Sequence, residues 1–362
     1  DTDASIFPNA GELPGDGIDN DCDGADLAVT DTTGIFVAPV AFGGDDANPG
    51  TMAAPVSTFA RALSLATAQG KVIFASVGTW NEAVTLTTSV YGGFVPLFGT
   101  WIPTNGPGTV IAPALGISGG ETALLVPAGV TIEVAGVTAR GVTHNGWASA
   151  IRVFGDVRVR DSVFIGGHAV GGGEQNTIRV DGGTTYLQNV RADAGVADGN
   201  FAQALRLSGA DVTAIVNNSM FSGARAASLH VRTVLVDFGS HLTLIDSRVE
   251  PGERAQSAGI GMLVNLGSAA FVTASSVRGP DAGAASVDGA WGIQVSAGSR
   301  VAVMDSNVES GRAPGNTYGL ENFGTATVIR STVIGGPSAA QYANGIINQS
   351  AATATIVGSV VR

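Results

Sequence analysis

The sequence predicts an all-β fold, a parallel β-helix in which short strands wind around one long core. Three observations predict it: a motif that recurs at nearly regular spacing, short apolar alternations bounded by glycine, and few bulky side chains. Of the 362 residues, 52 are glycine and only 6% are aromatic. Hydrophobic residues make up 44%, which supplies a continuous core and rules out long-range disorder.

The recurring motif reads Ser-x-Val after a polar residue and before a glycine. Its clearest copies are residues 246–249, 305–308 and 330–333. The spacing is regular, because 28 residues separate Gly167 from Gly195 and Gly195 from Gly223. Three short strands and three turns fill about 28 residues, which is one coil of a β-helix. We therefore expect about nine coils in residues 122–362.

Apolar alternation marks the same strand in successive coils. The matching pairs are Ile151 with Val153, Ile178 with Val180, Leu205 with Leu207, and Ile293 with Val295. One coil cannot bury its inward face alone, so stacked coils must share a core. A β-sandwich is the alternative, but it does not require this self-similarity at fixed spacing.

The N-terminal part of the chain has a different pattern. Residues 55–69 predict a short amphipathic helix, with Phe59, Leu63 and Ala66 on one face and Gly70 at its end. Residues 71–77 alternate as a first strand. A helix across the open end of a solenoid blocks edge-to-edge pairing, so we expect it to be the N-terminal cap.

Residues 45–51, Pro55, this helix and residues 78–82 resemble the opening of right-handed β-helix proteins of the pectate-lyase-like superfamily. The most similar subgroup is bacterial surface proteins that carry a domain of unknown function. The resemblance covers residues 35–362 and implies a right-handed, single-stranded parallel β-helix. It leaves activity open, because the superfamily contains lyases, hydrolases, adhesins and structural fibres. The expected division is an Asp-rich segment (1–34), a cap with the first coils (35–121) and regular coils (122–362).

An Asp-rich stretch at residues 16–24 carries the one chemical motif. Asp19, Asp21 and Asp23 occupy positions 1, 3 and 5 of a calcium loop, and Gly24 permits its turn. Thr30 stands where an EF-hand has glutamate, so the loop is not an EF-hand. Oxygen ligands favour Ca²⁺ over zinc or copper. The alternative is a solvated acidic tail.

This stretch resembles the Asp-rich metal-binding repeats of bacterial secreted proteins, with residues 1–6 and Pro8 as the preceding half. The resemblance implies that a cysteine just upstream accompanies Cys22, which is the only cysteine of the sequence. The predicted ligands of Ca²⁺ are Asp16, Asp19, Asp21, Asp23, Asp1 and Asp3. Asp26 and Asp31 are further oxygen donors nearby.

Candidate catalytic residues are few. Asp161, Asp246 and Asp305 take like positions in their coils but are not in consecutive coils, so hydrogen bonding at a turn is the favoured role. An arginine-rich strip could bind an acidic sugar with Arg160 as a lyase base, although ordinary outward-facing side chains explain it equally well. The strip comprises Arg152, Arg158, Arg160 and Arg179.

The four histidines (His144, His168, His230 and His241) lie in separate coils without metal-ligand spacing. No catalytic residue is therefore predicted, and the enzyme question stays open with a preference for a non-enzyme.

The net charge and the last coil limit the classes of function that the chain can have. The chain has 18 basic and 30 acidic residues, a net charge of −12, which excludes a nucleic-acid-binding protein. No apolar run reaches the ~18 residues of a membrane-spanning helix. The last coil, residues 344–362, lacks a capping segment, so either the sequence is cut from a longer protein or this end is an assembly surface.

We expect a non-catalytic extracellular or cell-surface protein of bacterial origin that assembles head to tail into a filament. The alternatives are a polysaccharide lyase or glycoside hydrolase, and an adhesin or glycan-binding module. Self-association is thus the expected partnership, and polysaccharide is the other candidate partner.

Overall fold

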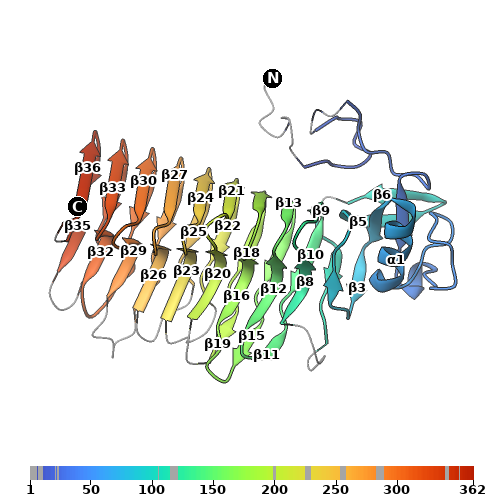
Figure 1. The fold of residues 1–362 in the computed structure, drawn as a ribbon, viewed down its shortest axis with the longest axis horizontal. Coiled ribbons are helices and arrows are strands. Elements are labelled where there is room, and N and C mark those ends of the chain that lie inside the picture. Colours follow the sequence, from blue (N-terminus) through green and yellow to red (C-terminus); the bar gives the residue numbers. More distant parts are fainter. Residues whose placement is uncertain are drawn as a thin grey trace.

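The computed structural model describes residues 6, 11–20, 22, 24–104, 106–114, 121–198, 201–224, 230–252, 258–282, 289–338, 342–349 and 351–362. These residues form a β-helix of three long sheets, with one α-helix near the N-terminal end (Figure 1). Each regular coil passes through one strand of each of the three long sheets. The predicted all-β parallel solenoid is confirmed.

Sheet A contains β1 (Gly34–Val37), β2 (Val72–Ser76), β5 (Val90–Leu97), β9 (Thr131–Ala135), β13 (Asp156–Arg160), β17 (Thr184–Gln188), β21 (Thr213–Asn217), β24 (His241–Ile245), β27 (Ala269–Thr273), β30 (Arg300–Met304), β33 (Thr325–Ile329), β36 (Thr353–Val357) and, beside β5, the antiparallel β6 (Thr100–Pro103). Sheet B contains β3 (Gly78–Trp80), β7 (Thr109–Ile111), β10 (Val137–Arg140), β14 (Val163–Ile165), β18 (Arg191–Asp193), β22 (Met220–Ser222), β25 (Arg248–Glu250), β28 (Ser276–Arg278), β31 (Asn307–Glu309), β34 (Thr332–Ile334) and β37 (Val360–Val361).

Sheet C contains β4 (Val84–Thr85), β8 (Thr122–Val126), β12 (Ala148–Val153), β16 (Gln175–Val180), β20 (Phe201–Ser208), β23 (His230–Asp237), β26 (Ala258–Val264), β29 (Ala290–Val295), β32 (Thr317–Asn322) and β35 (Ala343–Asn348). A small sheet D, beside sheet C, contains β11 (Thr143–Asn145), β15 (His168–Val170) and β19 (Val196–Ala197). From β9 onward, sheet A has nine parallel strands in the described chain, so the expected number of coils is confirmed.

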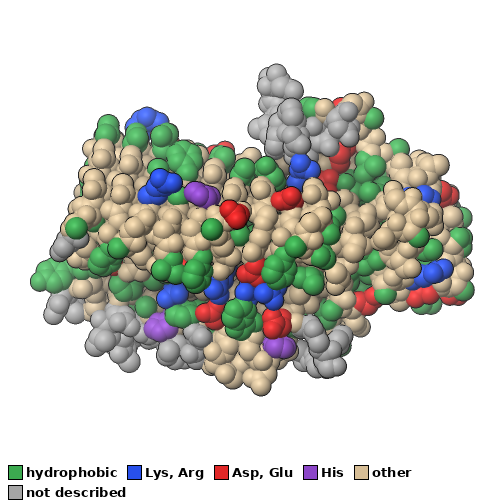
Figure 2. Space-filling view, in the orientation of Figure 1, with side chains coloured by type: hydrophobic (Ala, Val, Ile, Leu, Met, Phe, Trp, Pro, Cys, Tyr) green, Lys and Arg blue, Asp and Glu red, His purple; other side chains and the backbone are tan. Residues whose placement is uncertain are grey.

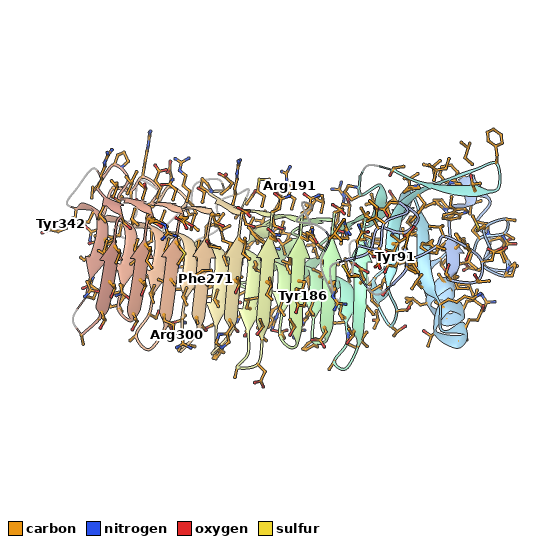
Figure 3. All side chains as sticks on the ribbon, turned by 90° about the horizontal axis from the view of Figure 1, so that it is seen from above. Tyr91, Tyr186, Arg191, Phe271, Arg300 and Tyr342 are labelled. Atoms are coloured by element: carbon orange, nitrogen blue, oxygen red, sulfur yellow. The ribbon has the colours of Figure 1, made fainter. Side chains whose placement is uncertain are left out.

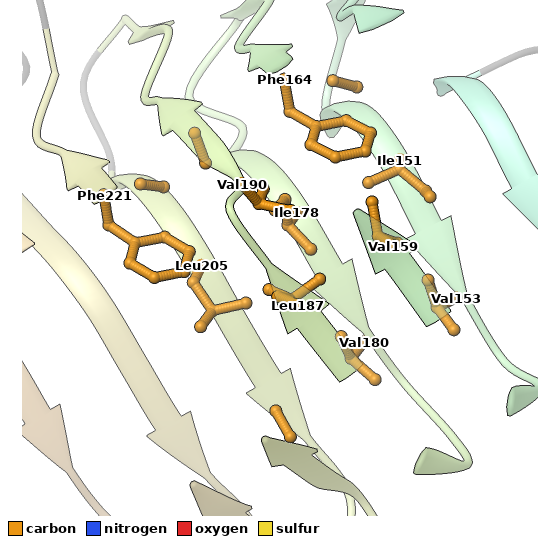
Figure 4. Close-up of a cluster of buried hydrophobic side chains, with 14 of the residues drawn as sticks. Ile151, Val153, Val159, Phe164, Ile178, Val180, Leu187, Val190, Leu205 and Phe221 are labelled. Carbon is orange, nitrogen blue, oxygen red and sulfur yellow. The ribbon is translucent and has the colours of Figure 1, made fainter. Parts of the chain in front are cut away.

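Inward side chains stack in rows along the axis, and these rows form the core (Figure 4). On sheet B, buried Phe164 and Phe221 lie on either side of Ala192 in register. Sheet A faces them with Val159, Leu187 and others of its row. Each phenylalanine has room because the equivalent residue of a neighbouring coil is an alanine. Farther along the same row, valines take the place of both the phenylalanines and the alanine. Small and β-branched residues therefore fill this core, as the composition indicated.

The recurring Ser-x-Val motif forms the turn between sheets A and B. The residue before each serine has a positive φ, for example 45° at Asp246 and 48° at Ala274. The next backbone N–H cannot pair as in a strand, and a serine of the following coil accepts it instead: Ser247 N donates to Ser275 Oγ at 3.0 Å. We call this row the serine ladder, and its members are Ser219, Ser247, Ser275, Ser306, Ser331 and Ser359. The motif thus satisfies a buried backbone group in coil after coil.

The N-terminal cap is helix α1 (Phe59–Gln69), which Figure 1 shows at the end of the solenoid. The helix begins at Phe59 rather than Pro55, because Thr58 is its N-cap and accepts a hydrogen bond from Arg61 N at 3.1 Å. Gly70 ends it with a φ of 65°. Phe59 and Ala66 are buried, and they pack in the same cluster as the first coil.

The first strand is β1, not residues 71–77 as expected. Gly34 of β1 pairs in parallel with Val72 of β2, so β2 is the second strand of sheet A. Alternation is also lost in β2, because both of its faces are covered. Its outer face carries an aromatic cluster of Phe36, Phe74, Tyr91, Phe94 and Trp101. In the described residues, no helix is long and apolar enough to cross a membrane.

Candidate functional site

The Asp-rich segment folds into a loop that carboxylates hold together. Asp26 accepts hydrogen bonds from Gly15 N and Gly17 N, each at 2.9 Å. Asp19 accepts one from Gly24 N at 2.9 Å, and Asp16 accepts one from Ile18 N at 2.8 Å. Of the predicted ligands, Asp16 and Asp19 are therefore placed in one loop.

Four predicted ligands (Asp1, Asp3, Asp21 and Asp23) lie outside the described residues. Among the residues that are described, no group of three His, Cys, Asp or Glu side chains could hold a metal ion. The described part of the loop offers mainly oxygen donors, with Cys22 as an exposed thiol.

A buried glutamate, Glu12, organises the same segment. Its side chain accepts hydrogen bonds from Asn20 N at 2.7 Å and Leu27 N at 3.3 Å. Asn20 is also buried, and its Oδ1 accepts from Leu13 N at 2.9 Å. Sequence reasoning missed both residues, because it looked for metal ligands and not for side chains that bond the loop's own backbone.

The segment is docked on the outer face of sheet A. Arg160 donates from Nη1 to Gly11 O, and its Nε donates to Asp161 at 3.0 Å. A Cβ atom at Gly11 would collide with the Glu133 carboxylate. Arg160 is 5% exposed and is held by these partners, which favours a structural role over the alternative role of a lyase base.

Glu133 is a titratable group beneath this docked segment. Tyr91 (Figure 3) donates its hydroxyl to Glu133 Oε2 at 2.7 Å. Burial raises the pKa of Glu133 from 4.5 to about 7, against the opposing hydrogen bond of Tyr91 and the charges of Arg160 and Arg158. Burial and the neighbouring Glu133 also raise the pKa of Tyr91.

We expect the folded protein to lose stability as the pH rises through about 7. A carboxyl with a raised pKa favours the folded state below its unfolded pKa, and that contribution is lost as the group ionises. At about 1.4 kcal/mol per pKa unit, the change between pH 5.5 and 8.5 is about 2 kcal/mol, because part of the contribution is already lost at pH 5.5. Thermal unfolding of the wild type and Glu133→Gln at both pH values measures it. Identical pH profiles for the two proteins would contradict the prediction.

The most distinctive polar surface of the chain is the outer face of sheet C. Arg152, Arg179 and Arg206 lie side by side on β12, β16 and β20. Figure 2 shows basic and acidic side chains interleaved in a band across this lower face. The arginines recur every 27 residues, a period that matches the coil. This period could have revealed the row in the sequence.

The predicted arginine strip is not one surface. Arg152 and Arg179 belong to sheet C, whereas Arg158 and Arg160 lie on β13 of sheet A. Arg158 instead lies over the ring of Tyr186, with 5.8 Å between the guanidinium carbon and the ring centroid. Grouping by proximity in sequence joined residues from two sheets, because a coil turns within a few residues.

Ion pairs hold the arginine row. Asp181 binds both Arg152 at 2.7 Å and Arg179 at 2.8 Å. Glu121 is a second partner of Arg152 at 3.2 Å, and Glu174 binds Arg206. Each of these guanidinium groups therefore has a carboxylate partner.

A second row on the same face carries side-chain amides. Asn176 and Gln203 are in register on β16 and β20, and both are completely buried. Neither amide oxygen nor amide nitrogen has a hydrogen-bond partner within the described structure. The Nε atoms of Arg206 and Arg232 are also without one there. Buried polar groups are normally paired, so these four residues are unusual.

Aromatic rings complete this surface, which we call the amide–arginine site. The Trp147 ring lies 3.8 Å from the Arg179 guanidinium and 5.8 Å from that of Arg206. Phe201 lies 3.7 Å from Arg232 and stacks on His230 at 5.1 Å. Burial lowers the pKa values of Arg179 and Arg232. A hollow of about 280 Å³ opens beside the site, lined by Glu121, His144, Asn145, Gly146, Trp147 and Arg152.

A larger hollow, about 720 Å³, follows the turn between sheets A and B. Asp161 and Asp246 line it, together with Asn189 and Asn218 of the coils between them. Asn189 donates to Asp161 at 2.5 Å, and outside this hollow Arg330 binds Asp305 at 2.6 Å. Of the three aspartates that sequence reasoning singled out, Asp161 and Asp305 thus have the expected side-chain hydrogen bonds at this turn.

The histidines do not form a common site. His168 bonds Asp198 at 2.7 Å, and its neighbour His144 lies on the adjacent strand of sheet D. His230 lies on sheet C, and His241 is exposed on sheet A.

Comparisons with known proteins agree with this architecture. A family model named Cu-binding MopE, described as "Putative metal-binding motif", matches residues 1–26. No curated protein matches the chain. The family-model match confirms the resemblance to a metal-binding repeat, and the parallel sheets of the structure itself confirm the β-helix.

Solved structures show the likeness in fold. Pectate lyase Pel9A is 14% identical, with 90% of this chain and 77% of that chain covered and a TM-score of 0.45. A GH136 lacto-N-biosidase from Eubacterium ramulus is 9% identical, with coverages of 90% and 68% and a TM-score of 0.30. The A-module of the mannuronan C-5 epimerase AlgE6 from Azotobacter vinelandii is 13% identical, with coverages of 83% and 93% and a TM-score of 0.24. At these identities the likeness concerns the fold alone.

Proposed function

We propose that this protein is a secreted bacterial β-helix that binds a glycan on the outer face of sheet C. The observation that carries the proposal is the pair of buried amides, Asn176 and Gln203, whose donors and acceptors have no partner in the described chain. An amide offers two donors and an acceptor, so it matches the hydroxyl groups of a sugar. Trp147 adds an exposed amphipathic ring, and the hollow that it lines with Asn145 and Arg152 adds polar groups that a glycan could reach.

Replacing Gln203 with leucine separates a binding role from a structural one. Leucine removes a buried amide without partners, so we expect the free protein to gain about 1–2 kcal/mol of stability. The same change removes hydrogen bonds to the glycan, and affinity is expected to fall about tenfold or more. Thermal unfolding and isothermal titration calorimetry with neutral and acidic oligosaccharides measure the two effects.

The matched control is Gln188→Leu, which lies on sheet A and is partly exposed. It is expected to leave affinity unchanged. If Gln203→Leu destabilised the free protein and left binding intact, the amide would have a structural role and the proposal would fail.

We further propose that the N-terminal loop binds Ca²⁺ through Asp16, Asp19, Asp21, Asp23, Asp1 and Asp3. The predominance of carboxylate oxygen supports a hard cation, although the matching family model carries the name of copper. When bound, the ion would add charge neutralisation that the loop's own hydrogen bonds cannot supply. The similarity of this motif to repeats of bacterial secreted proteins supports an extracellular location.

Removing calcium with a chelator is expected to lower the unfolding temperature. A ligand present at 100 times its dissociation constant stabilises by about 2.7 kcal/mol. In the Asp19→Ala, Asp21→Ala double variant, the chelator should have no effect, whereas Asp211→Ala, an exposed aspartate elsewhere, should behave as the wild type. A chelator effect that persists in the double variant would place the site elsewhere.

Head-to-tail self-assembly is a second proposal. Its support is the repeat itself, because each strand of a long sheet in the described chain pairs in parallel with the equivalent strand of the next coil. Coils of a second copy could continue such parallel sheets. Electron microscopy should then show fibres with an axial repeat of roughly 45–55 Å, from ~4.8 Å per coil. Discrete short rods under every condition would contradict assembly.

A further inference from the structure

The N-terminal segment, residues 11–26, is held in shape by its own side chains where the structure describes it. Glu12 and Asn20 bind its backbone from within, and Asp26 binds two N–H groups of its turn. The chain after it is anchored to the cap, because both the carboxylate and the carbonyl of Asp31 accept hydrogen bonds there at 2.7 Å. The segment can therefore leave the solenoid as one unit while the chain behind it stays in place.

This segment meets the solenoid over the Glu133 carboxyl of β9. Arg160 of β13 donates from Nη1 to the Gly11 carbonyl, and the Gly11 backbone lies so close to Glu133 that a Cβ atom there would collide with Oε1. The nearby residues Leu13 and Pro14 form part of the wall of the hollow of about 720 Å³. Docking of the segment thus covers Glu133 and completes that hollow.

Three groups of the solenoid face Glu133. Tyr91 of β5 donates its hydroxyl to Oε2 at 2.7 Å, and the charges of Arg160 and Arg158 on β13 favour the ionised carboxylate. Arg160 does not neutralise it fully, because its Nε donates to Asp161 at 3.0 Å. A negative charge on Glu133 is therefore only partly compensated.

The segment places a second carboxyl beside Glu133. Glu12 is 5% exposed, its backbone bonds the Glu133 carboxyl, and its charge acts on Tyr91. Two carboxylates buried together repel each other strongly, because little water screens them. A proton on Glu133 removes that repulsion, whereas ionised Glu133 needs water that the docked segment excludes.

We infer that the N-terminal segment is a strap whose docking is controlled by the protonation of Glu133. While this carboxyl is neutral, Gly11 and Glu12 close over it. Once it is ionised, the segment lifts and water solvates the carboxylate. Release removes Leu13 and Pro14 from the wall of the hollow and separates the Asp-rich loop from sheet A. The device is independent of any glycan bound on sheet C.

The strap should release near neutral pH. Burial raises the pKa of Glu133 from 4.5 to about 7 in the docked state. Docking is therefore strongest below the ordinary pKa of 4.5, and it weakens as the pH rises through about 7. At about tenfold per pKa unit, the docking equilibrium shifts about 30-fold toward release between pH 5.5 and 8.5.

Hydrogen exchange of the full chain, measured by mass spectrometry and corrected for the pH dependence of the chemical exchange rate, tests this inference. In the wild type, protection of residues 11–20 should fall about 30-fold from pH 5.5 to 8.5, while β9 and β13 keep theirs. Glu133→Gln should keep the segment protected at both pH values, because an amide does not ionise. The matched control is Glu309→Gln, which alters a loose pair with Arg278 at 3.9 Å on sheet B and should behave as the wild type.

A second variant, Gly11→Ala, should give the opposite result. The added Cβ atom collides with Glu133, so the segment should already lack protection at pH 5.5. Protection of residues 11–20 that does not change with pH, or that falls equally in Glu133→Gln, would overturn the inference. A parallel loss of protection in β9 and β13 would also overturn it, because the solenoid would then be unfolding and the strap would not be released alone.

Discussion

Phe221→Ala is expected to lower the free energy of unfolding by about 3–5 kcal/mol. Phe221 is completely buried on β22, and its neighbours in the row are Ala192 and Val249. The side chains of both neighbours are too small to fill the space left by the ring. The backbone cannot move in either, because each coil is fixed by hydrogen bonds to the coils on both sides. The cavity would therefore persist and its lining would lose contacts.

Urea denaturation measures this loss, and Phe271→Ala is the matched control. Phe271 is 36% exposed on the outer face of sheet A (Figure 3), so the same deletion there should cost little. Phe221→Val should lie between the two, since valine occupies this row from Val249 onward. Equal losses at Phe221 and Phe271 would contradict a core that depends on packing between coils.

Asp181→Ala is expected to destabilise the protein by about 3–5 kcal/mol, although it removes only one carboxylate. Asp181 binds both Arg152 and Arg179, and the Arg179 side chain is only 7% exposed. Without Asp181, a buried guanidinium would have no counter-charge at hydrogen-bonding distance. Replacement by asparagine should cost less, because the amide oxygen still accepts a hydrogen bond.

The comparison is Asp305→Ala, which breaks the exposed pair with Arg330. Those side chains are 45% and 59% exposed, so water and salt already screen their attraction. Unfolding temperatures at low and high salt distinguish the two cases, because the exposed pair should lose its small effect in salt. A similar loss of stability in both variants would show that burial does not govern the Asp181 pairs.

The fold could be predicted because equivalent positions in successive coils carry the same types of residue. The Ser-x-Val motif recurs since each serine accepts the same backbone N–H, and alternation recurs since each inward row must be apolar. The first strand was missed because β1 is only Gly34–Val37, too short to show alternation, and both its faces are buried.

The site was less accessible to sequence reasoning. Asn176, Gln203 and the arginines at 152, 179 and 206 share a 27-residue period, which predicts that they lie side by side. Burial of the amides could not be predicted, because it depends on neighbouring loops such as the one that places Trp147 over Arg179. The docking of the N-terminal loop on Arg160 joins residues 149 positions apart, and no local pattern encodes it.

Because the serine ladder repeats in each coil, the length of the solenoid can change without a change in the amide–arginine site or the N-terminal loop. Ser247 and Ser275 begin equivalent repeats, so removal of residues 247–274 would bring Ser275 to the position at which Ser247 accepts from Ser219 N. The row on sheet B would then pass from Phe221 to Val277 where it now passes to Val249, and the rod would shorten by ~4.8 Å. Neither the amide–arginine site nor the N-terminal loop lies in that repeat. Evolution or a protein engineer could therefore adjust how far this molecule reaches without redesigning what it holds.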